Sequence, residues 1–163
     1  MAITVLLVDD DEKVRGLLRR RLEAAGYSVV ESSSAEEALT RYQAAPPDVV
    51  FTDIVLPGKS GLQLISDLEK KFPGARVVAM SGAFESDVPG LLRRSKEVGA
   101  VYGLPKPFTT GQMLEAVQAA LTAPMGAAPP AREPDQSRVV RWALLGALLV
   151  LLGIMFGIGV LRH

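Results

Sequence analysis

Five short apolar runs, each followed by an amphipathic stretch, divide the first 121 residues and limit the folds open to the chain. The first run, at residues 3–8, is apolar at nearly every position, which is typical of a strand buried on both faces of a sheet. Such strands belong to parallel sheets that have helices on both sides. The five runs lie at residues 3–8, 27–31, 48–52, 75–80 and 101–104.

The stretches between the runs carry helix signals. Leu18 and Leu22 lie at helical spacing, and Gly26 follows where that helix is expected to end. Ser34 and Glu37 fit a capping box, in which both side chains meet backbone donors at a helix start. The expected helices lie at residues 14–25, from 34 onward, 60–72, 86–98 and 109–121. This alternation predicts an α/β fold with a doubly wound (βα)5 parallel sheet.

Charged and hydroxyl-bearing residues stand at or just after the ends of four of the five predicted strands. The carboxyl ends of parallel strands meet at one edge of a sheet, and ligands bind there. We therefore expect these side chains to lie close together and to form the functional site. They are Asp9, Asp10, Asp53, Ser81 and Lys106.

The composition excludes several other kinds of site. The chain has no cysteine, so it holds no disulfide, no thiolate metal site and no cysteine nucleophile. Its single histidine, His163, stands at the C-terminus and is not expected to act as a buried general base. The 18 basic and 18 acidic side chains give a net charge of zero. That balance argues against nucleic acid as a partner.

Four segments of the sequence together resemble the receiver domains of two-component response regulators. They are LLVDDDEKVRGLLRRRLEAAGY, VVFTDIVLPGKSGLQLI, VVAMSGA and LPKPF, in this order along the chain. The resemblance covers residues 3–121. It implies a flavodoxin-like domain that accepts a phosphoryl group from a histidine kinase or a phosphotransfer protein.

The resemblance implies roles for the acidic strand-end residues. Asp53 matches the phospho-acceptor of the family, and a carboxylate nucleophile gives the reactive, reversible acyl phosphate that signalling needs. The resemblance also implies a Mg²⁺ site in which Asp10, Asp53 and the backbone carbonyl of Val55 are ligands, while Asp9 holds a coordinated water. Oxygen donors of this kind suit Mg²⁺.

Two further matches and one departure concern the last two strands. Lys106 matches the lysine whose ammonium offsets charge on the phosphoryl oxygens, and the bond from it to Pro107 is cis in the family. Ser81 matches the hydroxyl that turns toward the phosphoryl group. The family usually has an aromatic residue three positions before the lysine, where this chain has Gly103. In the family, rotation of this aromatic side chain reports phosphorylation to a partner surface. The neighbouring Tyr102 is expected to point to the other face of the sheet, so this chain is expected to report phosphorylation in a different way.

The C-terminal part of the chain has a different composition. Residues 142–161 are 20 residues without a charged side chain. At 1.5 Å per residue, a helix of this length spans roughly 30 Å, the thickness of the bilayer hydrocarbon. We therefore predict a receiver domain at 1–121, a flexible linker rich in proline and alanine at 122–138, and a C-terminal transmembrane helix at 139–163. A buried helix in a soluble core is the alternative for the apolar stretch.

The residues that flank the apolar stretch predict its orientation. Three arginines precede it and only Arg162 follows it, so the positive-inside rule puts the receiver domain on the cytoplasmic side of a bacterial inner membrane. A span this close to the C-terminus is expected to insert as a tail anchor. Gly153 and Gly157 form a GxxxG pair, which leaves a homodimer open.

These observations predict a membrane-tethered receiver that signals to an unknown downstream protein or acts as a phosphate sink. The alternative is a receiver-like scaffold that docks partners at the membrane without being phosphorylated. The chain is not expected to be an enzyme. Phosphatases that use a strand-end aspartate need a second aspartate two residues later, and Val55 stands at that position.

Overall fold

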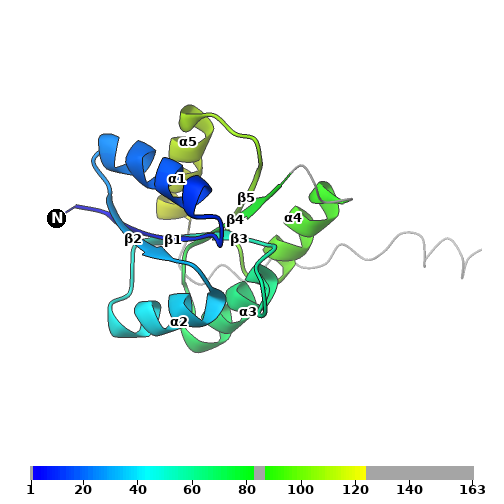
Figure 1. Cartoon of the computed structure of the whole chain (residues 1–163). Helices are drawn as coiled ribbons and strands as arrows, with labels where there is room; N and C mark the ends of the chain where they lie inside the picture. Colours follow the sequence, from blue (N-terminus) through cyan, green and yellow to red (C-terminus); the bar gives the residue numbers. More distant parts are fainter. Residues whose placement is uncertain (1, 83–86, 124–163) are drawn as a thin grey trace, which may run out of the picture. The chain divides into compact units, whose positions relative to one another are not determined.

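The structure, a computed structural model, describes residues 2–82 and 87–123. Strands and helices alternate along this part of the chain, as the sequence predicts (Figure 1). The elements are β1 (Thr4–Val8), α1 (Glu12–Ala24), β2 (Ser28–Ser32), α2 (Ala35–Ala44), β3 (Val49–Asp53), α3 (Gly61–Lys71), β4 (Val77–Ser81), α4 (Val88–Glu97), β5 (Tyr102–Pro105) and α5 (Thr110–Thr122).

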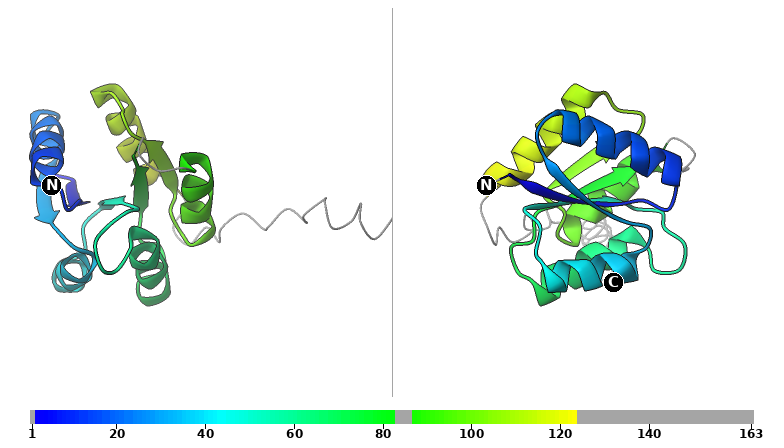
Figure 2. Two further views of the ribbon diagram at one scale, coloured as in Figure 1. Left: turned by 45° about the vertical axis from the view of Figure 1, so that its right-hand side comes forward. Right: turned by 60° about the vertical axis from the view of Figure 1, so that its left-hand side comes forward.

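The strands form one parallel sheet in the order β2-β1-β3-β4-β5. Helices α1 and α5 cover one face, and α2, α3 and α4 cover the other, which is visible from two further directions in Figure 2. This is the doubly wound, flavodoxin-like arrangement expected from the alternation of apolar runs and amphipathic stretches.

The core has two halves because the side chains of each strand alternate between the two faces. Leu6 and Val8 of β1 pack with α2 and α3, whereas Val5 and Leu7 pack with α1 and α5. All four side chains are at most 1% exposed. Burial on both faces explains why the run at residues 3–8 lacks the alternation of a half-exposed strand.

The predicted helix start at α2 is confirmed with a small change in its hydrogen bonds. The Ser34 hydroxyl accepts a hydrogen bond from the Glu37 backbone N–H at 3.2 Å. The Glu37 carboxylate accepts from the backbone N–H of Ser33 at 2.9 Å, one residue before the expected donor. Both side chains thus satisfy backbone donors at the start of the helix, as a capping box does.

The predicted linker at 122–138 lies outside the described residues except for Thr122 and Ala123, and the predicted transmembrane helix at 139–163 lies wholly outside them. Within residues 2–82 and 87–123, every helix is too short or too polar to cross a bilayer.

Candidate functional site

The carboxyl ends of four strands bring the predicted site residues to one edge of the sheet. Asp9 follows the last residue of β1, Asp53 ends β3 and Ser81 ends β4. Lys106 follows Pro105, the last residue of β5, and Pro105 pairs with Ser81 in the sheet register. The strand order puts β3 between β1 and β4, so Asp53 occupies the middle of this edge.

One ammonium group joins the two buried carboxylates. The Nζ atom of Lys106 donates a hydrogen bond to Oδ2 of Asp9 at 2.8 Å and a second one to Oδ2 of Asp53. Burial by itself would lower the pKa of Lys106, but the hydrogen bonds to Asp53 and Asp9 outweigh it and raise that pKa. Lys106 therefore carries its positive charge at neutral pH.

Asp9 is a fixed, buried member of the site. It is 1% exposed, and this burial raises the pKa of its carboxyl above the ordinary value, although Lys106 acts in the opposite direction. Its second oxygen, Oδ1, accepts a hydrogen bond from the backbone N–H of Asp11 at 3.0 Å. Both oxygens of Asp9 thus have partners within the protein.

Asp53 is held from two sides and lies beside an exposed residue. Its Oδ1 accepts from the Val55 backbone N–H at 2.9 Å, and its Oδ2 accepts from Lys106. The whole Asp53 residue is 8% exposed, whereas Val55 is 53% exposed. The Asp53 side chain itself is 12% exposed, so it is not sealed off from solvent.

Gly61 fixes the backbone behind Asp53. A Cβ atom on Gly61 would lie 1.9 Å from the backbone oxygen of Asp53, which is far inside van der Waals contact. The Gly61 N–H donates to the Ile54 carbonyl at 2.9 Å. Helix α3 therefore begins directly against the end of β3, and only glycine allows this approach. The sequence alone identifies Gly61 merely as a residue near a helix start.

Ser81 and Lys106 are also linked through the backbone. The Lys106 N–H donates to the Ser81 carbonyl at 2.7 Å, and Ser81 is fully buried. The peptide bond between Lys106 and Pro107 is cis, as the family resemblance implies.

Asp10 does not join the carboxylates of the site. It is exposed, and the described residues contain no group of three or more His, Cys, Asp or Glu side chains that could hold a metal ion. Asp9 and Asp53 do lie together on Lys106, and Val55 follows Asp53 by two residues. The carboxylates of Asp9 and Asp53 and the backbone carbonyl of Val55 are all oxygen donors. Such donors fit Mg²⁺, an ion that binds one or two carboxylates and keeps several waters.

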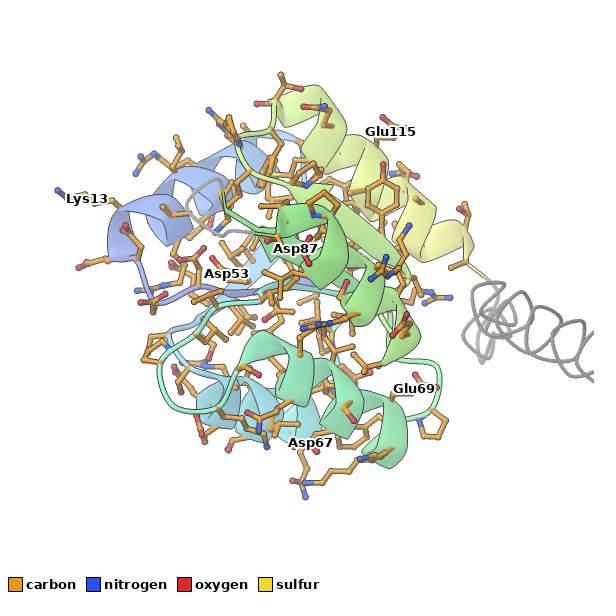
Figure 3. All side chains as sticks on the ribbon, turned by 90° about the vertical axis from the view of Figure 1, so that its right-hand side faces the viewer. Lys13, Asp53, Asp67, Glu69, Asp87 and Glu115 are labelled. Atoms are coloured by element: carbon orange, nitrogen blue, oxygen red, sulfur yellow. The ribbon has the colours of Figure 1, made fainter. Side chains whose placement is uncertain are left out.

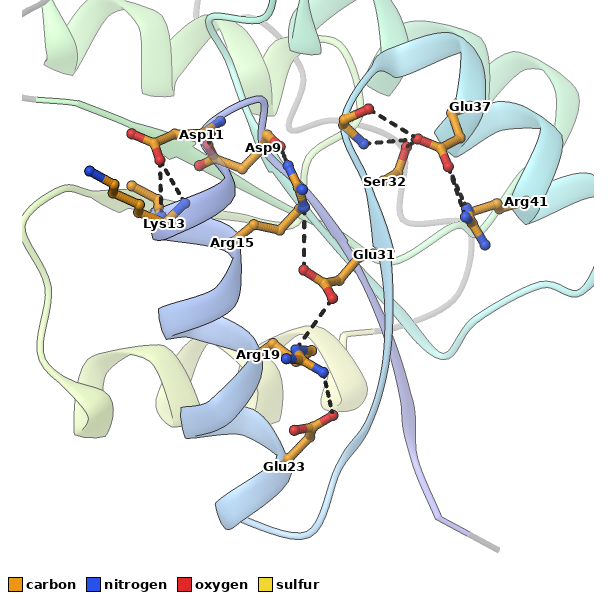
Figure 4. A network of polar contacts seen from close by, with 12 residues as sticks. Asp9, Asp11, Lys13, Arg15, Arg19, Glu23, Glu31, Ser32, Glu37 and Arg41 are labelled. Carbon is orange, nitrogen blue, oxygen red and sulfur yellow. Dashed lines mark hydrogen bonds and ion pairs between the residues drawn. The ribbon is translucent and has the colours of Figure 1, made fainter.

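Arg15 is a site residue that the sequence does not reveal. Its Nη1 donates to the backbone carbonyl of Asp9 at 2.8 Å, and its Nε lies 3.3 Å from Oε1 of Glu31 (Figure 4). Arg19 adds a second contact to Glu31 at 3.3 Å. In the sequence, Arg15 looks like one more solvated residue of α1, because its partners are contributed by β2 and by the end of β1.

Gly103, three residues before Lys106 in β5, lies in close contact with helix α4. A Cβ atom on Gly103 would lie 3.3 Å from Cβ and Cδ2 of Leu92 in α4. Tyr102 points to the opposite face and packs with the half of the core beneath α5, as the alternation along the strand predicts. The space beside Gly103 is thus partly filled by Leu92.

Comparison with known proteins identifies the family. Residues 5–118 match the sequence model of the response regulator receiver domain. The chain belongs to this family. The receiver domain is 32% identical over 123 residues to the chemotaxis protein CheY of Halobacterium salinarum, a match that covers 76% of this chain and 100% of that protein.

Other relatives are longer than the receiver domain. The alkaline phosphatase synthesis transcriptional regulatory protein PhoP of Bacillus subtilis is 34% identical over 77% of this chain and 51% of its own length. The DNA-binding transcriptional regulator NtrC of Klebsiella pneumoniae is 33% identical over 71% of this chain and 24% of its own length. The match therefore spans about half of PhoP and a quarter of NtrC.

Solved structures agree with this assignment. The receiver domain of NtrX from Brucella abortus superimposes with a TM-score of 0.68 at 29% identity, covering 73% of this chain and 99% of that one. The chemotaxis protein CheY4 of Vibrio cholerae gives 0.67 at 28% identity, covering 74% and 100%. Receiver domains are generally phosphorylated on an aspartate, bind Mg²⁺ at that site, and interact with histidine kinases or phosphotransfer proteins and with downstream effectors.

Proposed function

We propose that the chain is a phosphorelay receiver whose Asp53 accepts a phosphoryl group from a histidine kinase or a phosphotransfer protein. The observation that carries this proposal is the Lys106 ammonium held between the buried carboxylates of Asp9 and Asp53. A strand-end carboxylate with a fixed cation beside it suits a nucleophile that takes on a dianionic group.

In the proposed reaction, an oxygen of Asp53 attacks the phosphorus of a phosphohistidine. A bond from phosphorus to oxygen forms, and the bond from phosphorus to the imidazole nitrogen breaks. The electron pair stays on the imidazole, which takes up a proton from solvent and leaves as the neutral ring. Lys106 stays protonated and offsets the charge on the phosphoryl oxygens. The Val55 backbone N–H orients the nucleophile, and the Ser81 hydroxyl is assigned to the bound phosphoryl group.

The metal of this site is proposed to be Mg²⁺. Asp10, Asp53 and the backbone carbonyl of Val55 would hold it, with Asp9 acting through a coordinated water. When bound, Mg²⁺ supplies positive charge that reduces the repulsion between a carboxylate and the phosphoryl oxygens. Asp10 is exposed, so its side chain is available to turn toward an ion at this edge of the sheet.

The proposal is tested by incubating the full chain with acetyl phosphate and Mg²⁺ and separating the products on a Phos-tag gel. We expect a retarded, hydroxylamine-sensitive band that is lost in Asp53→Asn and in excess EDTA. Asp67→Asn is the matched control, since Asp67 lies on α3 and pairs with Lys59. A retarded band that persists in Asp53→Asn would refute the assignment.

We also propose that residues 142–161 anchor the receiver to a membrane, with the receiver on the cytoplasmic side. The support is the length of this stretch without a charged side chain. The full chain is expected to float with lipid vesicles and to resist carbonate extraction, whereas a chain that ends at Ala123 stays behind. A full chain that remains at the bottom of the gradient would rule out the anchor.

A homodimer through the GxxxG pair of Gly153 and Gly157 is a separate proposal. It is tested by crosslinking the full chain in vesicles.

The phosphorylated domain is proposed either to signal to an unknown downstream protein or to act as a phosphate sink. It is not proposed to turn over external substrates. One observation favours a second candidate, a scaffold that docks partners at the membrane without phosphorylation. Gly103 stands where the family usually has an aromatic residue, and Leu92 lies close beside it. The Phos-tag experiment separates the two candidates, because a scaffold gives no Asp53-dependent band.

A further inference from the structure

The end of the domain that lies opposite to Asp53 gathers the C-termini of its helices. Each helix runs back along the sheet, so it begins near the carboxyl edge and ends near the other edge. Figure 3 shows α3, α4 and α5 running from the side of Asp53 to the far side, where Glu69 is labelled. The last residue of α5, Thr122, therefore leaves the domain at the end remote from the candidate site.

This remote end carries a concentrated positive charge, which we call the basic end. Helix α3 finishes in two lysines, and the second half of α4 has three cations, all of them exposed. The basic end consists of Lys70, Lys71, Arg93, Arg94 and Lys96. Single cations in a last helical turn complement the helix dipole. Glu69 and Glu97 lie on the same two helix ends, so the five cations leave an excess of three positive charges there.

The two helix ends that form the basic end touch each other. A Cβ atom on Gly99, just after α4, would lie 2.9 Å from Cβ of Glu69 in the last turn of α3. Among the described residues, the only ion pair that involves the basic end joins Arg93 to Glu97 at 3.9 Å, and both side chains are more than half exposed. Four of the five cations of the basic end thus have no ion pair among the described residues, and the surface keeps a net positive charge for a partner.

In the sequence, the most apolar segment of the chain follows the last residues of α5. Eighteen residues separate Ala123 from residue 142, where the apolar stretch begins. A flexible chain of this length has an r.m.s. reach of roughly 25 Å. A bilayer that holds residues 142–161 would therefore lie within reach of the basic end, and bacterial inner-membrane lipids of anionic type offer the complementary charge.

We propose that the basic end binds the anionic surface of the membrane that anchors the chain, so that Asp53 faces away from the bilayer. This inference rests on the membrane anchor proposed above and adds an orientation to it. Facing away from the bilayer leaves the carboxyl edge open to a phosphoryl donor.

The orientation is tested with a matched pair of labelled chains. The chain has no cysteine, so one fluorophore can be attached to Pro73→Cys near the basic end or to Pro57→Cys near Asp53; both prolines are exposed. Each full chain is reconstituted in vesicles that carry a headgroup-linked quencher, made either of phosphatidylcholine alone or with phosphatidylglycerol. We expect quenching at Pro73 to rise about twofold with phosphatidylglycerol and to fall with added salt, with little change at Pro57.

Charge reversal supplies the control. Lys70→Glu with Arg94→Glu is expected to abolish the extra quenching at Pro73, whereas Lys13→Glu on α1 leaves it intact. Equal quenching of the two probes in both lipids would overturn the orientation while flotation still reports the anchor. A full chain that fails to float would overturn the anchor and the orientation together. Extra quenching that survives the double reversal would also overturn the proposal.

Discussion

At the scale of single residues, the site depends on one cation between two acids. Asp9 is almost fully buried, and its position is compatible with a charged form only because Lys106 and a backbone N–H compensate it. Removal of the lysine would leave two carboxylates facing each other at the end of the sheet. The same ammonium is therefore expected to support both the folded site and the transfer reaction.

We predict that Lys106→Gln slows phosphorylation by acetyl phosphate about a hundredfold, because the neutral amide no longer offsets the phosphoryl charge. The rate is measured from the retarded fraction on Phos-tag gels over time. Lys96→Gln, an exposed lysine on α4, is the control and is expected to react like the parent chain. An unchanged rate in Lys106→Gln would remove the lysine from the proposed reaction.

Glu37 provides a pH-dependent contribution to stability. The Ser33 backbone N–H and Arg41 lower its pKa from 4.5 to about 2. A lowered folded-state pKa stabilises above the unfolded value, so this contribution is complete above about pH 4.5 and disappears as the pH falls toward 2. We predict that Glu37→Gln loses about 1 kcal/mol of unfolding free energy at pH 7, and that the loss shrinks below pH 4.5.

Urea unfolding at pH 7 and at a series of lower pH values checks this prediction. Glu36→Gln is the matched control, because Glu36 is the adjacent acid in the same first turn and its carboxylate accepts no hydrogen bond from the described residues. A loss for Glu37→Gln that stays constant between pH 7 and pH 3 would show that the hydrogen bonds of the carboxylate are not its source.

The sequence anticipates some site residues better than others. Asp53, Ser81 and Lys106 are predictable because each stands directly at a strand end, and strand ends share one edge of a parallel sheet. Arg15 is not predictable, since its contact with the Asp9 carbonyl depends on how α1 lies beside β1 and β2. Helical spacing says which face of α1 is apolar, but not which strand-end carbonyl a polar residue meets.

At the scale of secondary-structure elements, the start of α3 determines the backbone position of Asp53. There is no space for a side chain at Gly61, so the first turn of α3 lies directly against the end of β3. The Gly61 N–H bonds the Ile54 carbonyl and closes the loop between them. This contact connects a helix on one face of the sheet directly to the proposed phospho-acceptor.

We predict that Gly61→Ala lowers the unfolding free energy by about 3 kcal/mol and reduces phosphorylation, because the new methyl group overlaps the Asp53 carbonyl. Gly16→Ala is the matched control. Its methyl group would meet only Arg20 at an ordinary 3.7 Å within α1, so a gain of up to about 1 kcal/mol is expected. Chemical unfolding and Phos-tag assays on both variants check the contrast. Equal stability of the two variants would contradict it.

The order and type of the elements follow from the sequence, but some of their contacts do not. Apolar runs of four to six residues between helical stretches identify the strands, and cap residues such as Ser34 locate the helix starts to within one or two positions. The approach of Leu92 to Gly103 is different. It depends on the packing of α4 on β5, and no periodicity within either segment reports that distance.

At the scale of the whole molecule, the described part of the chain already contains a complete two-sided core. Both halves of the core draw their residues from the strands, the helices and the loops that connect them between Thr4 and Thr122. We predict that a chain ending at Ala123 unfolds in a single cooperative transition, with a midpoint in urea equal to that of the receiver in the full chain. Broad unfolding of the shorter chain would show that residues beyond Ala123 contribute to the core.

The central claim is that Asp53 carries the phosphoryl group, and borohydride trapping tests it most directly. An acyl phosphate on aspartate is reduced to homoserine, which peptide mass spectrometry locates in the sequence. After reaction of the full chain with acetyl phosphate and Mg²⁺, we expect homoserine at position 53 and at no other aspartate. Homoserine at Asp9 or Asp10, with Asp53 unmodified, would contradict the assignment of Asp53 as the phospho-acceptor.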